Sequence, residues 1–171
     1  QEDRQRTELG VAAAVAAGTV TADLEAVVEA NTLLSGLGFE SGGLAAAHAF
    51  AQSFTALPAV NDAYLHGEMV AIGTLTQLMI ESRPDEARRV ARFFAAVGLP
   101  VHLGHIGVDP ADAEAIETIV GGALAFPFIG NMPVPIDAAV LRQGLLGAHE
   151  LGVVVAAELG DAPYLKLHAQ R

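Results

Sequence analysis

The sequence predicts an all-α fold, a bundle of several helices in one domain over residues 1–171. Hydrophobic residues make up 52% of the chain but aromatic residues only 5%. Ala and Leu, which are strong helix formers, therefore dominate the apolar positions. These apolar residues recur every three or four positions, as on one face of a helix. Alternating β-branched runs bounded by turns, which would indicate paired strands, do not occur in the sequence.

Two helices are expected in the first part of the chain. Residues 7–17 are rich in Ala, and Gly18 is expected to end this helix. Thr21 is expected to cap a second helix, whose apolar stripe runs over residues 24–34. The glycine-containing run 35–39 is expected to break that helix.

The middle of the chain predicts two helices joined by a reversal. Small residues over 44–57 favour a closely packed helix, which Pro58 is expected to stop. Asn61 and Asp62 are typical turn residues, and the apolar segment 63–80 that follows predicts another helix. Two helices joined in this way run in opposite directions.

Three further helices are expected in the rest of the chain. Ser82 is expected to cap the first, and Gly98 to end it. Asp109 is expected to cap the second, with Pro110 at its first position. Residues 136–159 predict a long last helix.

The charge and composition exclude several classes of partner. The formal net charge of -11 argues against nucleic acid and against an anionic membrane surface, because both would repel the protein. No signal peptide and no uninterrupted apolar stretch of about 18 residues is evident, so a soluble cytoplasmic protein is expected. The chain has no Cys, so a metal ion would need His, Asp, Glu or backbone oxygen as ligands.

Two histidines are the candidate metal ligands. His48 and His66 each have a structural interpretation when taken alone, one in an apolar helix and the other near a helix start. On one continuous helix their separation in sequence would place them about 27 Å apart, too far to share an ion. The reversal between Pro58 and Asp62 allows two antiparallel helices to present both imidazoles to one zinc ion. A third ligand is not evident in the chain.

Three segments of the chain carry a resemblance to a known family. They are NTLLSGLGFESGGLAAAHA over 31–49, HGE with VAIGTLTQL over 66–68 and 70–78, and NMP over 131–133. Together they closely resemble the glycerol dehydrogenases of the iron-containing alcohol dehydrogenase superfamily. The similarity extends from about residue 20 to residue 159, and its first segment is long and specific.

The resemblance implies a subunit with two domains, of which this chain is the C-terminal, helical, metal-binding one, as in the dehydroquinate synthase-like proteins. The N-terminal NAD-binding domain is expected to be absent from this chain, where no glycine-rich dinucleotide motif follows a strand. His48 and His66 match two zinc ligands of the family, Phe39 matches a residue that lines the substrate pocket, and no further catalytic residue is implied. The third ligand, an Asp, is expected upstream.

The implied activity is oxidation of glycerol to dihydroxyacetone, with hydride transfer to NAD and one zinc ion per subunit as a Lewis acid. A homo-oligomer that acts on glycerol or a similar small diol is implied as well. Ala51, Met69 and Gly130 depart from the family pattern, which leaves open a dehydrogenase for another small diol or alcohol. A non-catalytic helical fragment, a degenerate assembly subunit and a plain helical bundle also stay open as interpretations of the chain.

The remaining histidines are expected to be structural. His102 and His105 lie in a connector, His149 lies within a helix, and His168 lies in a tail. Asp161 superficially resembles the segment that carries the family's Asp ligand, but it lies at the wrong end of the chain, and no role is expected for it.

Overall fold

A computed structural model describes residues 10–11 and 13–169 of the chain. The described residues form helices and no strand, so the all-α prediction is confirmed. Contacts between Cα atoms group the chain into two units, residues 1–43 and 44–171. The single domain expected over residues 1–171 stays a prediction.

The first unit begins with helical residues 10–11 and 13–17, which end at Gly18 as predicted. Gly18 has a φ of +63°, a left-handed conformation that favours glycine. The cap predicted at Thr21 is also confirmed, because its hydroxyl oxygen accepts a hydrogen bond from Leu24 N at 3.3 Å at the start of α2 (Ala22–Glu29).

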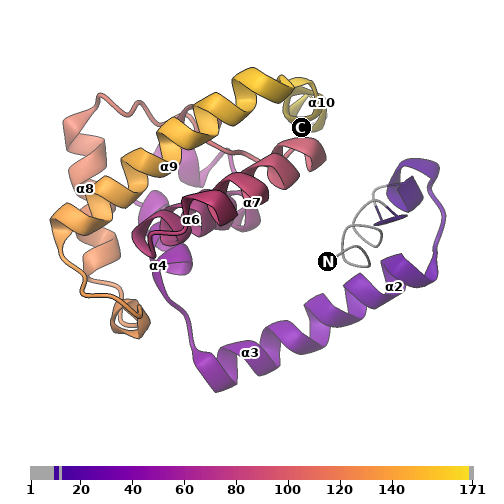
Figure 1. The fold of residues 1–171 in the computed structure, drawn as a ribbon, viewed down its shortest axis with the longest axis horizontal. Helices are drawn as coiled ribbons and strands as arrows, with labels where there is room; N and C mark the ends of the chain where they lie inside the picture. The colour runs from indigo at the N-terminus through magenta and orange to yellow at the C-terminus, as the bar shows by residue number, and fades with distance from the viewer. Residues whose placement is uncertain (1–9, 12, 170–171) are drawn as a thin grey trace. The chain divides into compact units, whose positions relative to one another are not determined.

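The break predicted over residues 35–39 is wrong. A π-helical turn, η1 (Ala30–Leu34), follows α2, and the helix continues as α3 (Ser35–Gly42) (Figure 1). Gly36 and Gly38 each weaken a helix by about 1 kcal/mol relative to Ala, but neither removes a backbone donor as Pro does.

The second unit is a layered arrangement of helices around α6 (Figure 1). In chain order its elements are α4 (Ala46–Phe54), α5 (Pro58–Asn61), α6 (His66–Ile80), α7 (Pro84–Val97), η2 (Leu103–Ile106), α8 (Ala113–Leu124), η3 (Ile129–Asn131), α9 (Ala138–Leu159) and α10 (Ala162–His168). Helix α6 packs against α4, α7 and α9, and α4 and α9 each pack against α8. Central α6 is apolar on several sides, as expected for a helix covered by neighbours.

Two clusters of buried side chains form the core of this unit. The larger lies between α4, α6, α8 and α9 and includes the fully buried Phe50, Phe54 and Leu145. The smaller lies between α6, α7 and α9 around Leu75 and Val155. Both clusters include residues of α6, so the helix that begins at His66 is anchored along its length by apolar packing.

Two helix boundaries predicted before α7 are wrong. Pro58 begins the short α5 instead of stopping the preceding helix, which has already ended at Phe54. This position suits Pro, because the first residue of a helix needs no backbone N–H. Arg83 is the N-cap of α7, while Ser82 adopts a positive φ of 57° in the turn before it.

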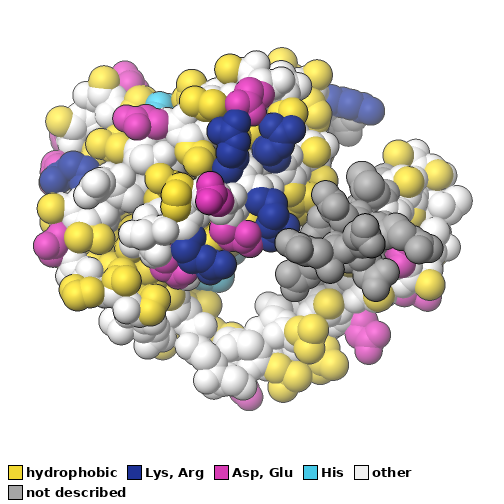
Figure 2. All heavy atoms as spheres, viewed as in Figure 1, with side chains coloured by type: hydrophobic (Ala, Val, Ile, Leu, Met, Phe, Trp, Pro, Cys, Tyr) yellow, Lys and Arg dark blue, Asp and Glu magenta, His cyan; other side chains and the backbone are white. Residues whose placement is uncertain are grey.

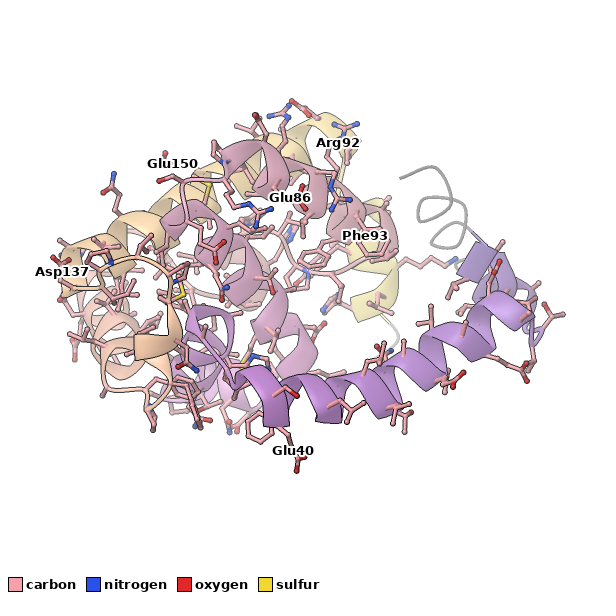
Figure 3. All side chains as sticks on the ribbon, turned by 60° about the horizontal axis from the view of Figure 1, so that its bottom comes forward. Glu40, Glu86, Arg92, Phe93, Asp137 and Glu150 are labelled. Atoms are coloured by element: carbon pink, nitrogen blue, oxygen red, sulfur yellow. The ribbon has the colours of Figure 1, made fainter. Side chains whose placement is uncertain are left out.

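The cap predicted at Asp109 is also wrong. Asp112 precedes α8, and its Oδ1 accepts hydrogen bonds from Glu114 N and Ala115 N, both at 3.1 Å. Asp109 instead binds Ala111 N at 2.9 Å in the turn before the helix. The long last helix is confirmed as α9, capped by Asp137 through a 2.8 Å bond from Val140 N (Figure 3). Helix α10 was not predicted.

Charged side chains pair on the surface formed by α7 and α9. Figure 2 shows Lys and Arg side chains interspersed with Asp and Glu on this face. Glu158 of α9 pairs with both Arg88 and Arg92 of α7, while Arg89 pairs with Glu86 within α7. Within the described ranges, no helix combines the length and the apolar composition that a membrane span requires.

Candidate metal centre

His48 is the third residue of α4, and contacts from two elements, α6 and η3, fix the start of that helix. The side-chain oxygen of Gln77, from α6, accepts a hydrogen bond from Ala47 N at 3.0 Å. The side-chain nitrogen of Asn131 donates to Leu44 O at 2.9 Å. Because the N-cap, Ala45, has no side-chain acceptor, Gln77 serves a backbone donor that the helix itself leaves open. The segment 131–133 singled out in the sequence thus supports the helix that carries His48.

His66 is the first residue of α6, directly after its N-cap, Leu65. Leu65 has an extended backbone, and its N–H donates to Glu68 Oε2 at 2.7 Å. This is half of a capping box, because Leu has no side-chain acceptor for the reciprocal bond. His66 is exposed and His48 is half-buried, so the pair lies at the surface of the second unit.

The structure brings the two predicted ligands together. The ring centres of His48 and His66 lie 5.7 Å apart, with the ring planes tilted by 44°. Two imidazoles bound to one tetrahedral zinc ion at about 2.0–2.1 Å have ring centres roughly 5 Å apart. Burial, and secondarily the neighbouring His66, lowers the pKa of His48 below its usual value, which favours the neutral ring that binds metal. The two side chains therefore fit as a pair of zinc ligands.

The described residues supply these two candidate ligands and no third. No group of three or more His, Asp or Glu side chains among them is arranged to hold a metal ion. Asp161 lies against His105, with Oδ1 3.3 Å from Nε2, and not against the His48–His66 pair. Phe39, the predicted substrate-pocket residue, lies in α3 of the first unit and is 50% exposed there.

A second group of histidines surrounds η2, and no pattern in the sequence predicts it. The ring of His102 lies 3.7 Å from that of His105 and 5.8 Å from that of His149, measured between centres. Burial is the main reason that the pKa of His102 falls to about 4, and the pKa values of His105 and His149 are lowered by burial too. Their structural role, expected from the sequence, stays a prediction.

His168 was expected to lie in a tail, but it lies at the end of helix α10. Its Nε2 lies 2.7 Å from Glu68 Oε1, which joins residues 100 positions apart. No signal in the sequence indicates this contact, because neither residue lies in a repeating pattern with the other. Glu68 also caps the start of α6, because its Oε2 accepts the bond from Leu65 N.

Comparison with known proteins identifies relatives of the chain. A glycolaldehyde reductase of Halobacterium salinarum is 43% identical over 145 residues, which are 84% of this chain and 40% of that protein. A glycerol dehydrogenase of Escherichia coli O6:H1 is 46% identical over 136 residues, 78% of this chain and 36% of that protein. The resemblance to the glycerol dehydrogenases is confirmed. No family model matches the chain.

Solved structures of glycerol dehydrogenases share the fold. A probable glycerol dehydrogenase from Sinorhizobium meliloti has a TM-score of 0.79 at 37% identity, and the match covers 90% of this chain and 42% of the S. meliloti chain. The Schizosaccharomyces pombe glycerol dehydrogenase has a TM-score of 0.82 at 32% identity, and the match covers 91% of this chain and 41% of the S. pombe chain. The chain thus spans about two fifths of the length of these four relatives.

Proposed function

We propose that this chain forms the zinc- and substrate-binding part of an NAD-dependent glycerol dehydrogenase. The approach of His48 and His66 carries the proposal, because two helices that are distant along the sequence present both imidazoles at a separation suited to one zinc ion. Several relatives that are named glycerol dehydrogenases support the choice of activity. Zinc suits the pair because both donors are imidazole nitrogens.

The residues of this chain would hold the zinc ion and orient the substrate. They would contribute less to the proton transfers of the reaction. His48 would act as a neutral donor held by α4, and His66 as a second donor held by the first turn of α6. A bound zinc ion supplies Lewis acidity toward a substrate hydroxyl. The two helices would then fix where that hydroxyl lies relative to the nicotinamide ring of NAD, which is a contribution of orientation.

Phe39 is proposed as an apolar wall of the glycerol site. An aromatic ring there would exclude water from the reacting carbon and would limit the size of the alcohol that enters. Phe39→Ala should then raise KM for glycerol while the zinc content stays unchanged. The complete enzyme is proposed to form a homo-oligomer, which sedimentation equilibrium of the full-length protein would test.

The proposal is tested on the full-length protein by zinc content and NAD reduction with glycerol. His48→Ala and His66→Ala should each lose the zinc and the activity together. His149→Ala is the matched control, because His149 is also half-buried on a helix but lies beside His102. Activity that survives loss of either proposed ligand would contradict the zinc centre.

A second substrate is favoured by one specific observation. The relative from Halobacterium salinarum, 43% identical, is named a glycolaldehyde reductase. Glycerol and glycolaldehyde share a hydroxyl next to the reacting carbon, so one metal centre could serve either. The ratio of kcat/KM for glycerol oxidation to that for glycolaldehyde reduction, measured with the same preparation, decides between them.

A further inference from the structure

We propose that the Glu68–His168 pair positions His66 for metal binding by fastening the first turn of α6 to the C-terminal helix α10. The inference rests on the proposed zinc centre. It assigns a role to two residues that do not themselves reach the metal. Glu68 is 2% exposed, and its two carboxylate oxygens serve different elements of the fold.

One oxygen of Glu68 holds the residue before His66. Oε2 accepts from Leu65 N at 2.7 Å and so fixes the N-cap of α6. His66 is the next residue, and both its neighbours along the chain, Leu65 and Gly67, are exposed. The ends of helices fray unless they are tied down, so this bond bears directly on the orientation of the His66 backbone.

The other oxygen of Glu68 is held by His168. Oε1 lies 2.7 Å from His168 Nε2, in the interior of the second unit. His168 Nδ1 faces Tyr164 O at 2.8 Å, and since a carbonyl only accepts, Nδ1 carries a hydrogen. The proton between Nε2 and Oε1 can lie on either atom without breaking the bond. The pair therefore holds Glu68 in one rotamer.

Helix α10 is in turn anchored at several points. The Tyr164 hydroxyl donates to His105 O, and the Tyr164 ring stacks on the His105 ring at 4.0 Å between centres. The His168 ring packs against Tyr164 at 4.0 Å and against Tyr64 at 6.2 Å. Since α10 is fixed by η2 as well as by its contact with α7, His168 approaches Glu68 from a rigid support.

These contacts form a chain from α10 to the proposed ligand. His168 orients Glu68, Glu68 holds Leu65 N, and Leu65 N precedes His66. Without His168, Oε1 of Glu68 would lose this hydrogen bond, and the side chain would take another rotamer or draw in water, since buried polar atoms are disfavoured when a hydrogen bond is lost. The N-cap would then loosen and His66 would sample orientations that do not bind zinc together with His48. Groups that orient metal ligands change metal affinity by about 10–100-fold when they are removed.

The test measures zinc affinity with a competing chelator and the visible spectrum of the cobalt-substituted full-length protein. His168→Ala should weaken zinc binding about tenfold and alter the cobalt spectrum. His168→Gln should restore most of the affinity, because its amide N–H can donate to Glu68. Glu68→Gln keeps an acceptor for Leu65 N but weakens the pair, and combined with His168→Ala it should lose less than the sum of the two single effects.

Lys166→Ala is the matched control, since Lys166 is an exposed residue of the same helix and takes no part in the contacts with Glu68. It should leave zinc affinity within about twofold of the wild type. Wild-type affinity in His168→Ala would overturn the inference, as would an equal loss in Lys166→Ala at the same stability of the metal-free protein. A wild-type protein that binds no zinc would instead overturn the proposed metal centre, and the inference with it.

Discussion

Gly73 of α6 packs directly against the carbonyl group of Ala47, the residue that precedes His48 in α4. A Cβ atom at position 73 would overlap the carbonyl oxygen of Ala47 and lie 2.9 Å from its carbonyl carbon. Backbone atoms cannot move aside as the end of a flexible side chain can. The close approach of Gly73 thus sets the distance between the helix that carries His48 and the helix that carries His66.

Gly73→Ala is therefore expected to push α4 and α6 apart. Overpacking of this kind costs about 1–3 kcal/mol, and zinc affinity should fall with it because the two imidazoles separate. Urea unfolding of the metal-free protein and a chelator competition measure the two effects. Gly121→Ala is the control, since a Cβ there meets nothing within 4 Å. Helix α8 should even gain slightly from this change, because Ala favours the helix more than Gly does.

Gln77→Met tests the hydrogen bond that fixes the start of α4. Met has a similar size and shape but cannot accept the bond that Ala47 N makes with Gln77 Oε1. The expected loss is about 1 kcal/mol of unfolding free energy, with weaker zinc binding because His48 lies in the same turn. The same change at the exposed Gln143 of α9 is the comparison. Unaltered stability and affinity in Gln77→Met would show that this bond is not needed.

The existence of the long helices and the approach of His48 to His66 could be predicted from the sequence. Apolar spacing repeats along a whole helix, so many residues contribute to that prediction. The resemblance implied the pairing of His48 with His66, and the residues Pro58, Asn61 and Asp62 favour the chain reversal that the pairing requires. The reversal exists, although Pro58 begins a short helix within it.

Several helix starts and the distant contacts could not be predicted, for physical reasons. Asp109 and Asp112 are equally good caps by residue type, and the choice depends on backbone geometry that the sequence pattern does not contain. The pair formed by Glu68 and His168 joins the start of α6 to the end of α10, and only the packing of the whole unit brings them together.

The choice between the two Asp residues yields a prediction for α8. Asp112→Ala removes the acceptor of two backbone N–H groups in the first turn, and should cost about 1 kcal/mol of unfolding free energy. Asp109→Ala removes the bond to Ala111 N in the preceding turn and should cost less. Urea unfolding of both variants gives the comparison. A larger loss of unfolding free energy in Asp109→Ala would indicate that Asp109 is the cap, as expected from the sequence.

The histidine group around η2 predicts a loss of stability in acid. Burial lowers the pKa of His102 from its ordinary value of 6.5 to about 4, helped by His105 and His149 and opposed by Asp161. Between these pH values the unfolded chain binds a proton that the folded protein does not. The unfolding free energy contributed by neutral His102 is therefore complete above pH 6.5 and falls as the pH drops toward 4.

Protonation of His102 should lower the unfolding free energy by about 2 kcal/mol. This is less than the full change in the pKa of His102 implies, because the residue is partly exposed. Other groups titrate in the same range, so the measurement compares wild type with His102→Gln, which keeps a similar size without an imidazole. Urea unfolding at about pH 7 records the cost of the substitution itself. The variant should then lose less stability than the wild type on going to about pH 4. Parallel losses in the two proteins would mean that His102 takes up its proton equally easily in the folded and unfolded chains.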